Sequence, residues 1–206
     1  MRQENNIEGI PSKEILQNLS IRDLIKVAGG WNEGHYVFRT GEHGNGYIEK
    51  MGFLRHPQIM TEIGRRLAKQ YEDMAEDIDI VVGPSIIGAI IACSTALELG
   101  KPYSLTYRST DKTKINFHRG FIPDEGTRCL FVDDFVFTGT DLTDNIRFMQ
   151  NQNLPVVGAS VIGYRNEIPL DVPFRGLLKV DFTKSSADAC QQCASGVPIT
   201  ASNIRE

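Results

Sequence analysis

The sequence predicts an α/β fold in which a parallel sheet is flanked by helices and carries a small hood. Two observations favour this class. From residue 78 to residue 163, short β-branched runs alternate with helical segments, which is the pattern of right-handed βαβ units in a parallel sheet. The chain has 206 residues, of which 41% are hydrophobic and 23% charged, and this is enough to bury the core of one soluble domain.

The N-terminal part predicts a helical cap followed by two β segments. Residues 11–30 contain two short helical patterns, and Ser20 with Asp23 three positions later resembles a capping box at the start of the second. Residues 35–53 predict two β segments joined by a glycine-rich turn. In residues 56–75, apolar side chains recur at four-residue spacing, which predicts an amphipathic helix.

The central part carries the regular alternation of strands and helices. We expect strands over 78–82, 103–107, 129–132 and 156–163, and helices over 86–99 and 140–150. A last strand candidate follows at 174–182. We expect one domain over residues 1–206, with cap and hood segments in 1–55, a ligand-binding core in 56–165, and a hood strand and tail in 166–206.

Charge and hydropathy exclude several classes of partner. The formal net charge is −4, and the lysines and arginines are scattered, so the sequence predicts no nucleic-acid surface. The sequence contains no apolar run of membrane-spanning length and no apolar core of a signal peptide near the N-terminus. We therefore expect a cytoplasmic protein with no membrane partner.

The chemistry is predicted to lie just after the strand at 129–132. There Asp133 and Asp134 precede a Thr138-Gly139-Thr140 turn that opens the next helix. Ligands of parallel sheets bind beyond the carboxyl ends of the strands. Backbone N–H groups of such a turn can hold a phosphate, and the carboxylates can bind vicinal hydroxyls or a hydrated Mg²⁺. The pattern indicates a sugar phosphate; the alternative is that the aspartates only end a strand and the turn only starts a helix.

The segment LFVDDFVFTGTDL resembles the 5-phosphoribosyl-1-diphosphate (PRPP) motif of type I phosphoribosyltransferases. Further segments follow the order of the orotate phosphoribosyltransferases, in particular the subgroup whose C-terminus carries C-x-x-C and then G-x-P. These segments are GHYVFRTGEHGNGYIEK, DIDIVVGPSIIGAIIA, HRGFIPDEGTRCLFVDD, SVIGYRNE and CQQCASGVPI. The similarity extends from about Gly34 to Ile199.

The resemblance implies roles for residues that match the PRPP motif. Asp133 and Asp134 match the pair that contacts the ribose hydroxyls. The loop around the 5-phosphate is matched by Phe137, Thr138, Gly139, Thr140 and Asp141. The residues matched to diphosphate binding are Gly83, Pro84, Ser85 and Gly88 in a turn and Arg108 at the end of a strand.

The resemblance also implies a mobile catalytic loop, a base site and a homodimer. Lys112, Lys114 and His118 lie where the family has a loop that reaches into the neighbouring subunit's site. Arg165 matches the arginine that pairs with the carboxylate of orotate, with a surface arginine paired to Glu167 as the alternative. Arg39 or Lys50 would then lie near the base.

The implied reaction is transfer of the phosphoribosyl group from PRPP to orotate, giving orotidine 5′-monophosphate and diphosphate in pyrimidine biosynthesis. Its oxocarbenium-like transition state calls for cations around the leaving diphosphate. We expect Mg²⁺ to bind through PRPP near Asp133 and Asp134, without direct ligation by the protein. A phosphoribosyltransferase for another base and a non-catalytic PRPP-binding regulator remain open alternatives.

Two residues depart from the family pattern, and the cysteines and histidines lie outside it. Phe137 stands where the family has a small or hydroxyl residue, and Asp141 stands where it has Ser or Ala. We expect Asp141 to point outward from the helix start, which leaves the phosphate cradle competent, because the preceding Thr138-Gly139-Thr140 turn is intact; an inward Asp141 would repel PRPP. Cys190 and Cys193 form half of a zinc site, and we interpret them as a structural turn, with a metal shared across a dimer as the alternative. His35 and His43 receive no role, and Cys93 and Cys129 are expected in the core.

Overall fold

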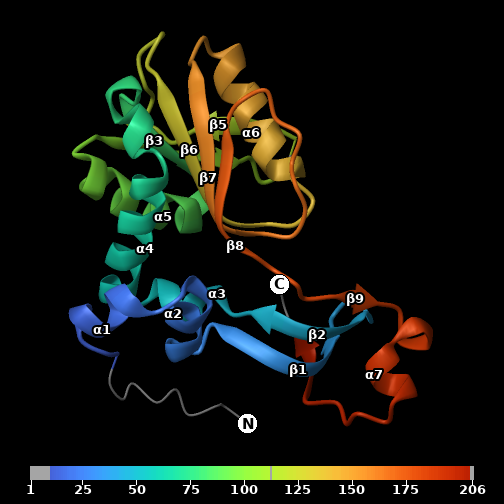
Figure 1. Cartoon of the computed structure of the whole chain (residues 1–206). Coiled ribbons are helices and arrows are strands. Elements are labelled where there is room, and N and C mark those ends of the chain that lie inside the picture. The colour runs from blue at the N-terminus through green and yellow to red at the C-terminus, as the bar shows by residue number, and fades with distance from the viewer. Residues whose placement is uncertain (1–9, 112, 205–206) are drawn as a thin grey trace. The chain divides into compact units, whose positions relative to one another are not determined.

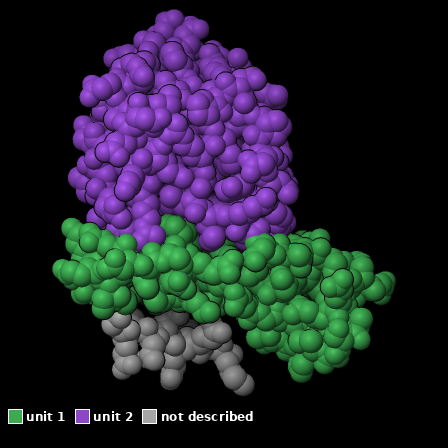
Figure 2. All heavy atoms as spheres, in the orientation of Figure 1, with its two compact units in different colours: residues 1–59, 181–206 green, residues 60–180 purple. Residues whose placement is uncertain are grey.

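The computed structural model of the chain describes residues 10–111 and 113–204. The chain divides into two compact units, coloured separately in Figure 2. Unit 1 comprises the chain up to Ile59 and again from Asp181 onward, and unit 2 comprises Met60–Val180. The boundary between the two units falls within helix α4 (Pro57–Gln70), between Ile59 and Met60.

Unit 2 contains the expected parallel sheet (Figure 1). The strands occur in the order β5-β4-β3-β6-β7-β8; β5 is antiparallel to β4, and the other neighbouring strands pair in parallel. After α4 and a 3₁₀ turn at Glu72–Asp77, the elements are β3 (Ile80–Pro84), α5 (Ser85–Leu99), β4 (Tyr103–Arg108), β5 (Ile115–Phe117), β6 (Cys129–Val136), α6 (Thr140–Asn151), β7 (Val156–Tyr164) and β8 (Phe174–Lys179). The predicted α/β class is confirmed.

The core of unit 2 is built on both faces of the central strands. Ile80 and Val82 of β3 pack in one cluster with the apolar stripe of α6, formed by Leu142, Ile146 and Met149. Val81, between Ile80 and Val82 in the chain, is buried on the opposite face, because successive side chains of a strand alternate. Burial on both faces explains why these strands are continuous apolar runs in the sequence.

Strand β6 is longer than expected, because it continues through the two aspartates to Val136. Its pairing with β7 continues beyond Asp133, with Phe135 opposite Gly163. A Cβ at Gly163 would collide with the Phe135 ring, so the glycine makes room for that ring and lets the two strands stay paired. The segment after β4 also differs from expectation, since it returns as strand β5 rather than as an irregular loop.

Unit 1 holds a smaller sheet with the strand order β10-β1-β2-β9. Its elements are α1 (Lys13–Asn18), α2 (Ile21–Val27), β1 (Trp31–Phe38), β2 (His43–Ile48), α3 (Lys50–Leu54), β9 (Lys184–Ser185), a 3₁₀ turn at Ala187–Ala189, α7 (Gln191–Ala194) and β10 (Ala201–Ile204). The predicted cap of α2 is confirmed: the Ser20 side chain accepts a hydrogen bond from the Asp23 N–H at 3.1 Å.

The strand candidate at 174–182 lies in a different sheet from the one expected. As β8 it pairs in parallel with β7 in unit 2, and the smaller sheet takes its C-terminal strands from β9 and β10. Aromatic packing accounts for the pairing of β8 with β7. The rings of Tyr164 and Phe174 meet edge to face with centroids 5.5 Å apart, and Gly176 leaves space for the Tyr164 ring.

Helix α5 buries only one of its faces, although it is apolar all round. Cys129 is buried as expected, but Cys93 is exposed on α5, so its expected place in the core was wrong. Ile86 and Leu97 are also largely exposed on this helix. Within the part of the chain that the structure describes, no helix combines the length and the apolar character that crossing a membrane requires.

Candidate active site

The topology of unit 2 predicts that ligands bind in a crevice at the carboxyl ends of β3 and β6. These strands are neighbours, but α5 leads from β3 to β4 on one side and α6 leads from β6 to β7 on the other. Where the strand order diverges in this way, the loops after the two strands separate and leave a crevice. The loops concerned are the turn at 83–88 and the loop at 137–140, both matched to PRPP binding in the sequence.

The two aspartates occupy the last part of β6 and are unequally buried. Asp133 is half-buried, whereas Asp134 is only 5% exposed. The Asp133 carboxylate accepts the Asp134 N–H at 2.8 Å, and the Asp134 carboxylate accepts the Phe135 N–H. The expectation that both aspartates come after the end of the strand was wrong, because β6 continues beyond them and buries Asp134.

The loop after β6 leads into the N-terminus of α6, where the Thr140 N–H donates a long hydrogen bond of 3.5 Å to the Thr138 hydroxyl. Gly139 is the N-cap of α6 with a φ of 80°, a conformation that glycine adopts without strain, and a Cβ there would approach Ile168 to 2.8 Å. The first backbone N–H groups of a helix have no partner within the helix, and the Gly139 N-cap offers no side-chain oxygen to cap them. Thr138 and Thr140 are exposed beside these donors.

The turn between β3 and α5 is held by close backbone packing. A Cβ at Gly83 would collide with the Gly88 carbonyl, and a Cβ at Gly88 would collide with Pro84. Ser85, the first residue of α5, has a φ of 61°, which is unusual for a residue with a side chain. The turn can therefore present backbone groups to a ligand at close range, as the sequence comparison implied for diphosphate.

Arg165 lies against Phe137 at the end of β7. Its guanidinium carbon is 4.6 Å from the centroid of the Phe137 ring, and the backbone N–H of Arg165 donates to the Val136 carbonyl at 3.1 Å. The side-chain Nε of Arg165 is buried, and none of the described residues accepts a hydrogen bond from it. The aromatic residue that departs from the family pattern thus provides the face on which this guanidinium stacks.

Arg108 lies between two aspartates of α6. Its Nε donates to Asp141 Oδ1 at 2.9 Å, and its Nη2 donates to Asp144 Oδ2 at 2.7 Å. The hydrogen bond to Asp144, followed by that to Asp141, raises the pKa of the Arg108 guanidinium. The Asp141 side chain is 76% exposed, which agrees with the expected outward orientation.

The remaining predicted residues are spread over both units. Lys112 lies outside the described residues. Lys114 and His118 are exposed at the two ends of β5, and the His118 ring lies 6.1 Å from that of Tyr107. Arg39 and Lys50 belong to unit 1, so their place near the base stays a prediction.

Comparison with known proteins identifies the family. The sequence profile of the phosphoribosyl transferase domain matches residues 52–180, which covers more than half of the chain and includes both loops of the crevice. The chain belongs to this phosphoribosyltransferase family. The resemblance found in the PRPP motif is thereby confirmed.

Similar proteins include several named orotate phosphoribosyltransferase. The Thermus thermophilus protein is 29% identical over 183 residues, 88% of this chain and 98% of that protein. The Thermotoga maritima protein is 27% identical over 180 residues, 86% of this chain and 94% of that protein. The structure of the Aeropyrum pernix orotate phosphoribosyltransferase has a TM-score of 0.65 at 22% identity, covering 78% of this chain and 93% of that one. The adenine phosphoribosyltransferase of Leishmania donovani has a TM-score of 0.58 at 18% identity, covering 79% and 81%.

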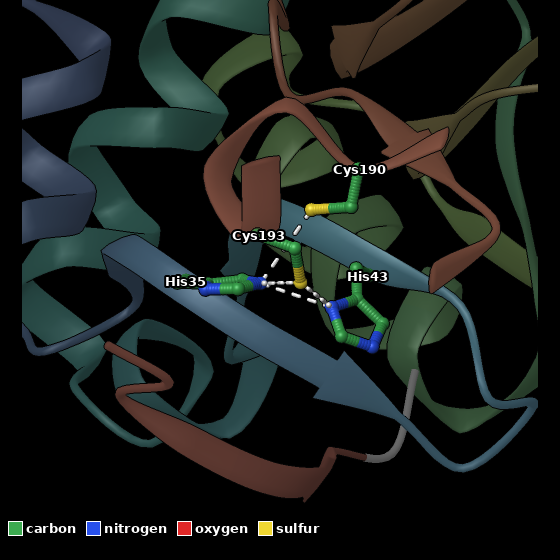
Figure 3. Close-up of side chains that lie close together, drawn as sticks. All are labelled: His35, His43, Cys190 and Cys193. Atoms are coloured by element: carbon green, nitrogen blue, oxygen red, sulfur yellow. Dashed lines mark hydrogen bonds between the residues drawn. The ribbon is translucent and has the colours of Figure 1, made fainter. Parts of the chain in front are cut away.

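One group of side chains in this phosphoribosyltransferase was not foreseen as a unit. His35 and His43, from the β1–β2 hairpin, meet Cys190 and Cys193 near α7 (Figure 3). From the sequence, the C-x-x-C pair was only half of a zinc site and the two histidines received no role, yet His35 lies 155 positions from Cys190 in the chain with its Nε2 only 3.5 Å from the Cys190 sulfur. The signal available in the sequence was two histidines flanking one β turn.

Proposed function

We propose that this chain transfers the phosphoribosyl group of PRPP to orotate, releasing diphosphate and forming orotidine 5′-monophosphate for pyrimidine nucleotide biosynthesis. The observation that carries the choice of base is Arg165, whose guanidinium stacks on Phe137 with its Nε buried and unpaired among the described residues. A buried planar donor without a partner calls for an anionic acceptor, and the carboxylate of orotate supplies one. Phe137 belongs to the loop that would hold the 5-phosphate, so a base beside Arg165 lies next to the sugar.

Binding of the ribose phosphate uses the end of β6 and the start of α6. The 5-phosphate would bind the first backbone N–H groups of α6, where the helix dipole favours an anion, with the Thr138 and Thr140 hydroxyls as further donors. Asp133 and Asp134 precede this cradle and would accept hydrogen bonds from the ribose hydroxyls. A neutral pair of residues at these positions would bind the hydroxyls more weakly.

The diphosphate would bind the turn at 83–88 and be accompanied by Mg²⁺. Mg²⁺ prefers oxygen ligands and commonly binds through one or two carboxylates together with substrate phosphates. Here the ion would be carried by the oxygens of PRPP and would lie near Asp133 and Asp134 without direct ligation by the protein, in agreement with the lack of a third His, Cys, Asp or Glu beside them among the described residues. When bound, the ion neutralises the charge of the leaving diphosphate.

The chain's own residues then hold the reacting groups in line. The ring nitrogen of orotate attacks C1 of the ribose and loses its proton to water, the bond from C1 to the diphosphate oxygen breaks, and the diphosphate leaves with the bonding electron pair. The carboxylate of Asp133 stabilises the positive charge that develops on the ribose. Arg165 keeps the base oriented toward C1 by holding its carboxylate. Lys114 and His118, with Lys112, would supply positive charge to the leaving group from the neighbouring subunit.

A homodimer is supported by the surface of α5. Ile86, Cys93 and Leu97 are exposed on this helix, and a contiguous exposed apolar stripe commonly marks a protein interface. The partner is a second copy of the chain, because the loop that carries Lys114 and His118 is expected to reach into the active site of a neighbouring subunit. Analytical ultracentrifugation of the wild type and of a Leu97→Glu variant tests this: we expect a dimer that the variant weakens.

One observation favours the second candidate, a PRPP-binding protein without turnover. Arg108, matched to diphosphate binding, is already paired with Asp141 and Asp144. A base screen separates the candidates: the chain is incubated with PRPP, Mg²⁺ and orotate, uracil or adenine, and release of diphosphate is measured. Release with orotate alone supports the proposal, release with another base refutes the choice of orotate, and PRPP binding without release favours the second candidate.

A further inference from the structure

The cluster of His35, His43, Cys190 and Cys193 is compact and belongs entirely to unit 1 (Figure 3). His35 Nε2 lies 2.9 Å from His43 Nδ1. The Cys193 sulfur lies 3.3 Å from His43 Nδ1 and 3.6 Å from His35 Nε2, and the Cys190 sulfur lies 3.5 Å from His35 Nε2. One potential ligand atom of each residue lies within 4.8 Å of all the others.

These distances correspond to the edges of a zinc tetrahedron. Zinc–nitrogen bonds of about 2.0–2.1 Å and zinc–sulfur bonds of about 2.3 Å put neighbouring ligand atoms about 3.3–3.8 Å apart. The three sulfur–nitrogen distances fall in this range, the nitrogen–nitrogen distance of 2.9 Å is shorter, and the two remaining distances, from the Cys190 sulfur to the Cys193 sulfur and to the nearer His43 nitrogen, are within 4.8 Å. Small side-chain rotations that even out these distances would admit the ion at the centre of the cluster.

The hydrogen bond between His35 Nδ1 and the Val197 carbonyl fixes the tautomer in which His35 Nε2 can bind a metal. His35 Nδ1 lies 2.8 Å from the Val197 carbonyl oxygen, which can only accept, so Nδ1 carries the proton. Nε2 is then left with a lone pair that faces His43 and the two sulfurs. Metal-binding histidines commonly have their second nitrogen fixed in this way by a carbonyl or a carboxylate.

Burial makes the same cluster costly without a partner at its centre. His35 is 1% exposed, His43 8% and Cys190 5%, whereas Cys193 lies at the exposed rim. Several polar atoms are thus brought face to face out of water, an arrangement that a bound cation compensates.

We propose that His35, His43, Cys190 and Cys193 bind one Zn²⁺ in a closed structural site. Two thiolates and two imidazoles at tetrahedral distances favour zinc over the oxygen-preferring Mg²⁺ and Ca²⁺. Four protein ligands leave no open position for a substrate, so the ion does not take part in phosphoribosyl transfer. The site goes beyond the proposed function and stands whether or not orotate is the base.

The ion would fasten the C-terminal segment to the N-terminal hairpin. Strand β10 pairs with β1, and the Thr200 N–H donates to the His35 carbonyl at 2.7 Å. On the other edge, β9 is only two residues long. Such short pairings provide few hydrogen bonds, and metal binding would add its free energy to the folding of this sheet.

Metal content tests the proposal. The full chain, without an affinity tag, is produced with added zinc, purified under reducing conditions and analysed by inductively coupled plasma mass spectrometry. We expect about one zinc per chain. The double variant Cys190→Ser, Cys193→Ser and the variant His43→Gln should each bind zinc more than about 100-fold more weakly. Removing a residue that only hydrogen-bonds a ligand lowers metal affinity by about 10- to 100-fold, so a larger loss indicates direct ligation. The matched controls Cys93→Ser and His56→Gln should keep it.

Cobalt substitution covers the case in which the ligand variants do not fold. Zinc is removed from the wild-type chain with a chelator and replaced by Co²⁺. We expect thiolate-to-cobalt charge-transfer absorption together with the visible bands of tetrahedral Co²⁺. In the zinc-free chain, hydrogen exchange should rise in β10 and α7 more than in β3 and β6.

Several outcomes would overturn the site. One is a folded wild type that takes up neither zinc nor cobalt on reconstitution, and another is cobalt binding without charge-transfer absorption. Wild-type zinc affinity in the folded His43→Gln variant would remove the four-ligand arrangement. A chain purified under reducing conditions that is lighter by two hydrogens, with Cys190 joined to Cys193, would replace the metal with a disulfide.

Discussion

Replacing Arg165 by alanine should weaken orotate binding far more than PRPP binding. The guanidinium is held on the Phe137 ring at 4.6 Å, and its Nε is buried without an acceptor among the described residues. In the proposed complex it gains charge-assisted hydrogen bonds to the orotate carboxylate, worth about 1.5–3 kcal/mol. At 25 °C this corresponds to an increase in the KM for orotate of about 10- to 150-fold.

Two variants separate recognition of the base from packing. Arg165→Lys keeps the charge but loses the planar fork, so we expect an intermediate rise in the KM for orotate. Phe137→Leu keeps Arg165 and removes a cation–π contact worth about 0.5–1 kcal/mol, so the KM for orotate should rise about 2- to 5-fold. Initial rates of orotate consumption are measured with each substrate varied in turn, after circular dichroism confirms folding. A folded Arg165→Ala enzyme whose two KM values change equally, or only for PRPP, would refute the role of Arg165.

Three further predictions concern the PRPP side of the site. The double variant Asp133→Asn, Asp134→Asn should fold but lose turnover, because each amide keeps the oxygen that accepts the backbone N–H but loses the negative charge. Near-normal rates in a folded double variant would show that neither carboxylate belongs to the active site. Asp141→Ser should change the Kd for PRPP by less than about tenfold, or about 1.4 kcal/mol, because the Asp141 side chain points to Arg108. The Kd is measured by calorimetry, and a far larger gain in affinity would mean that Asp141 blocks the phosphate cradle. Mixing a Lys114→Ala variant with an Asp133→Asn variant should restore some activity through hybrid sites, and no recovery despite demonstrated subunit exchange would argue against a shared loop.

The parallel sheet could be predicted because its strands are buried on both faces. Continuous apolar runs such as the one ending at Val132, each followed by a helix, are consistent with few other folds. The PRPP loop could be predicted for a similar reason, since one local segment carries both the aspartates and the helix start. Its boundaries were less accurate: the charge of Asp133 and Asp134 suggested the end of a strand, but pairing with β7 carries β6 on to Val136.

Features that depend on distant parts of the chain could not be predicted. The sheet to which residues 174–179 belong is decided by packing of Phe174 on Tyr164, which strand propensity does not reveal. The place of Cys93 depended on which face of the uniformly apolar α5 meets the sheet. The meeting of His35 with Cys190 requires the pairing of β1 with β10, and neither residue has a local pattern that announces it.

Product analysis tests the central claim most directly. The purified chain is incubated with PRPP, Mg²⁺ and orotate, and orotidine 5′-monophosphate and diphosphate are quantified over time. We predict that the two products form in equal amounts, that formation requires PRPP, and that the variant lacking the Asp133 and Asp134 carboxylates forms neither. A well-folded wild type that binds PRPP but yields no orotidine 5′-monophosphate, or that yields a nucleotide of another base instead, would contradict the account.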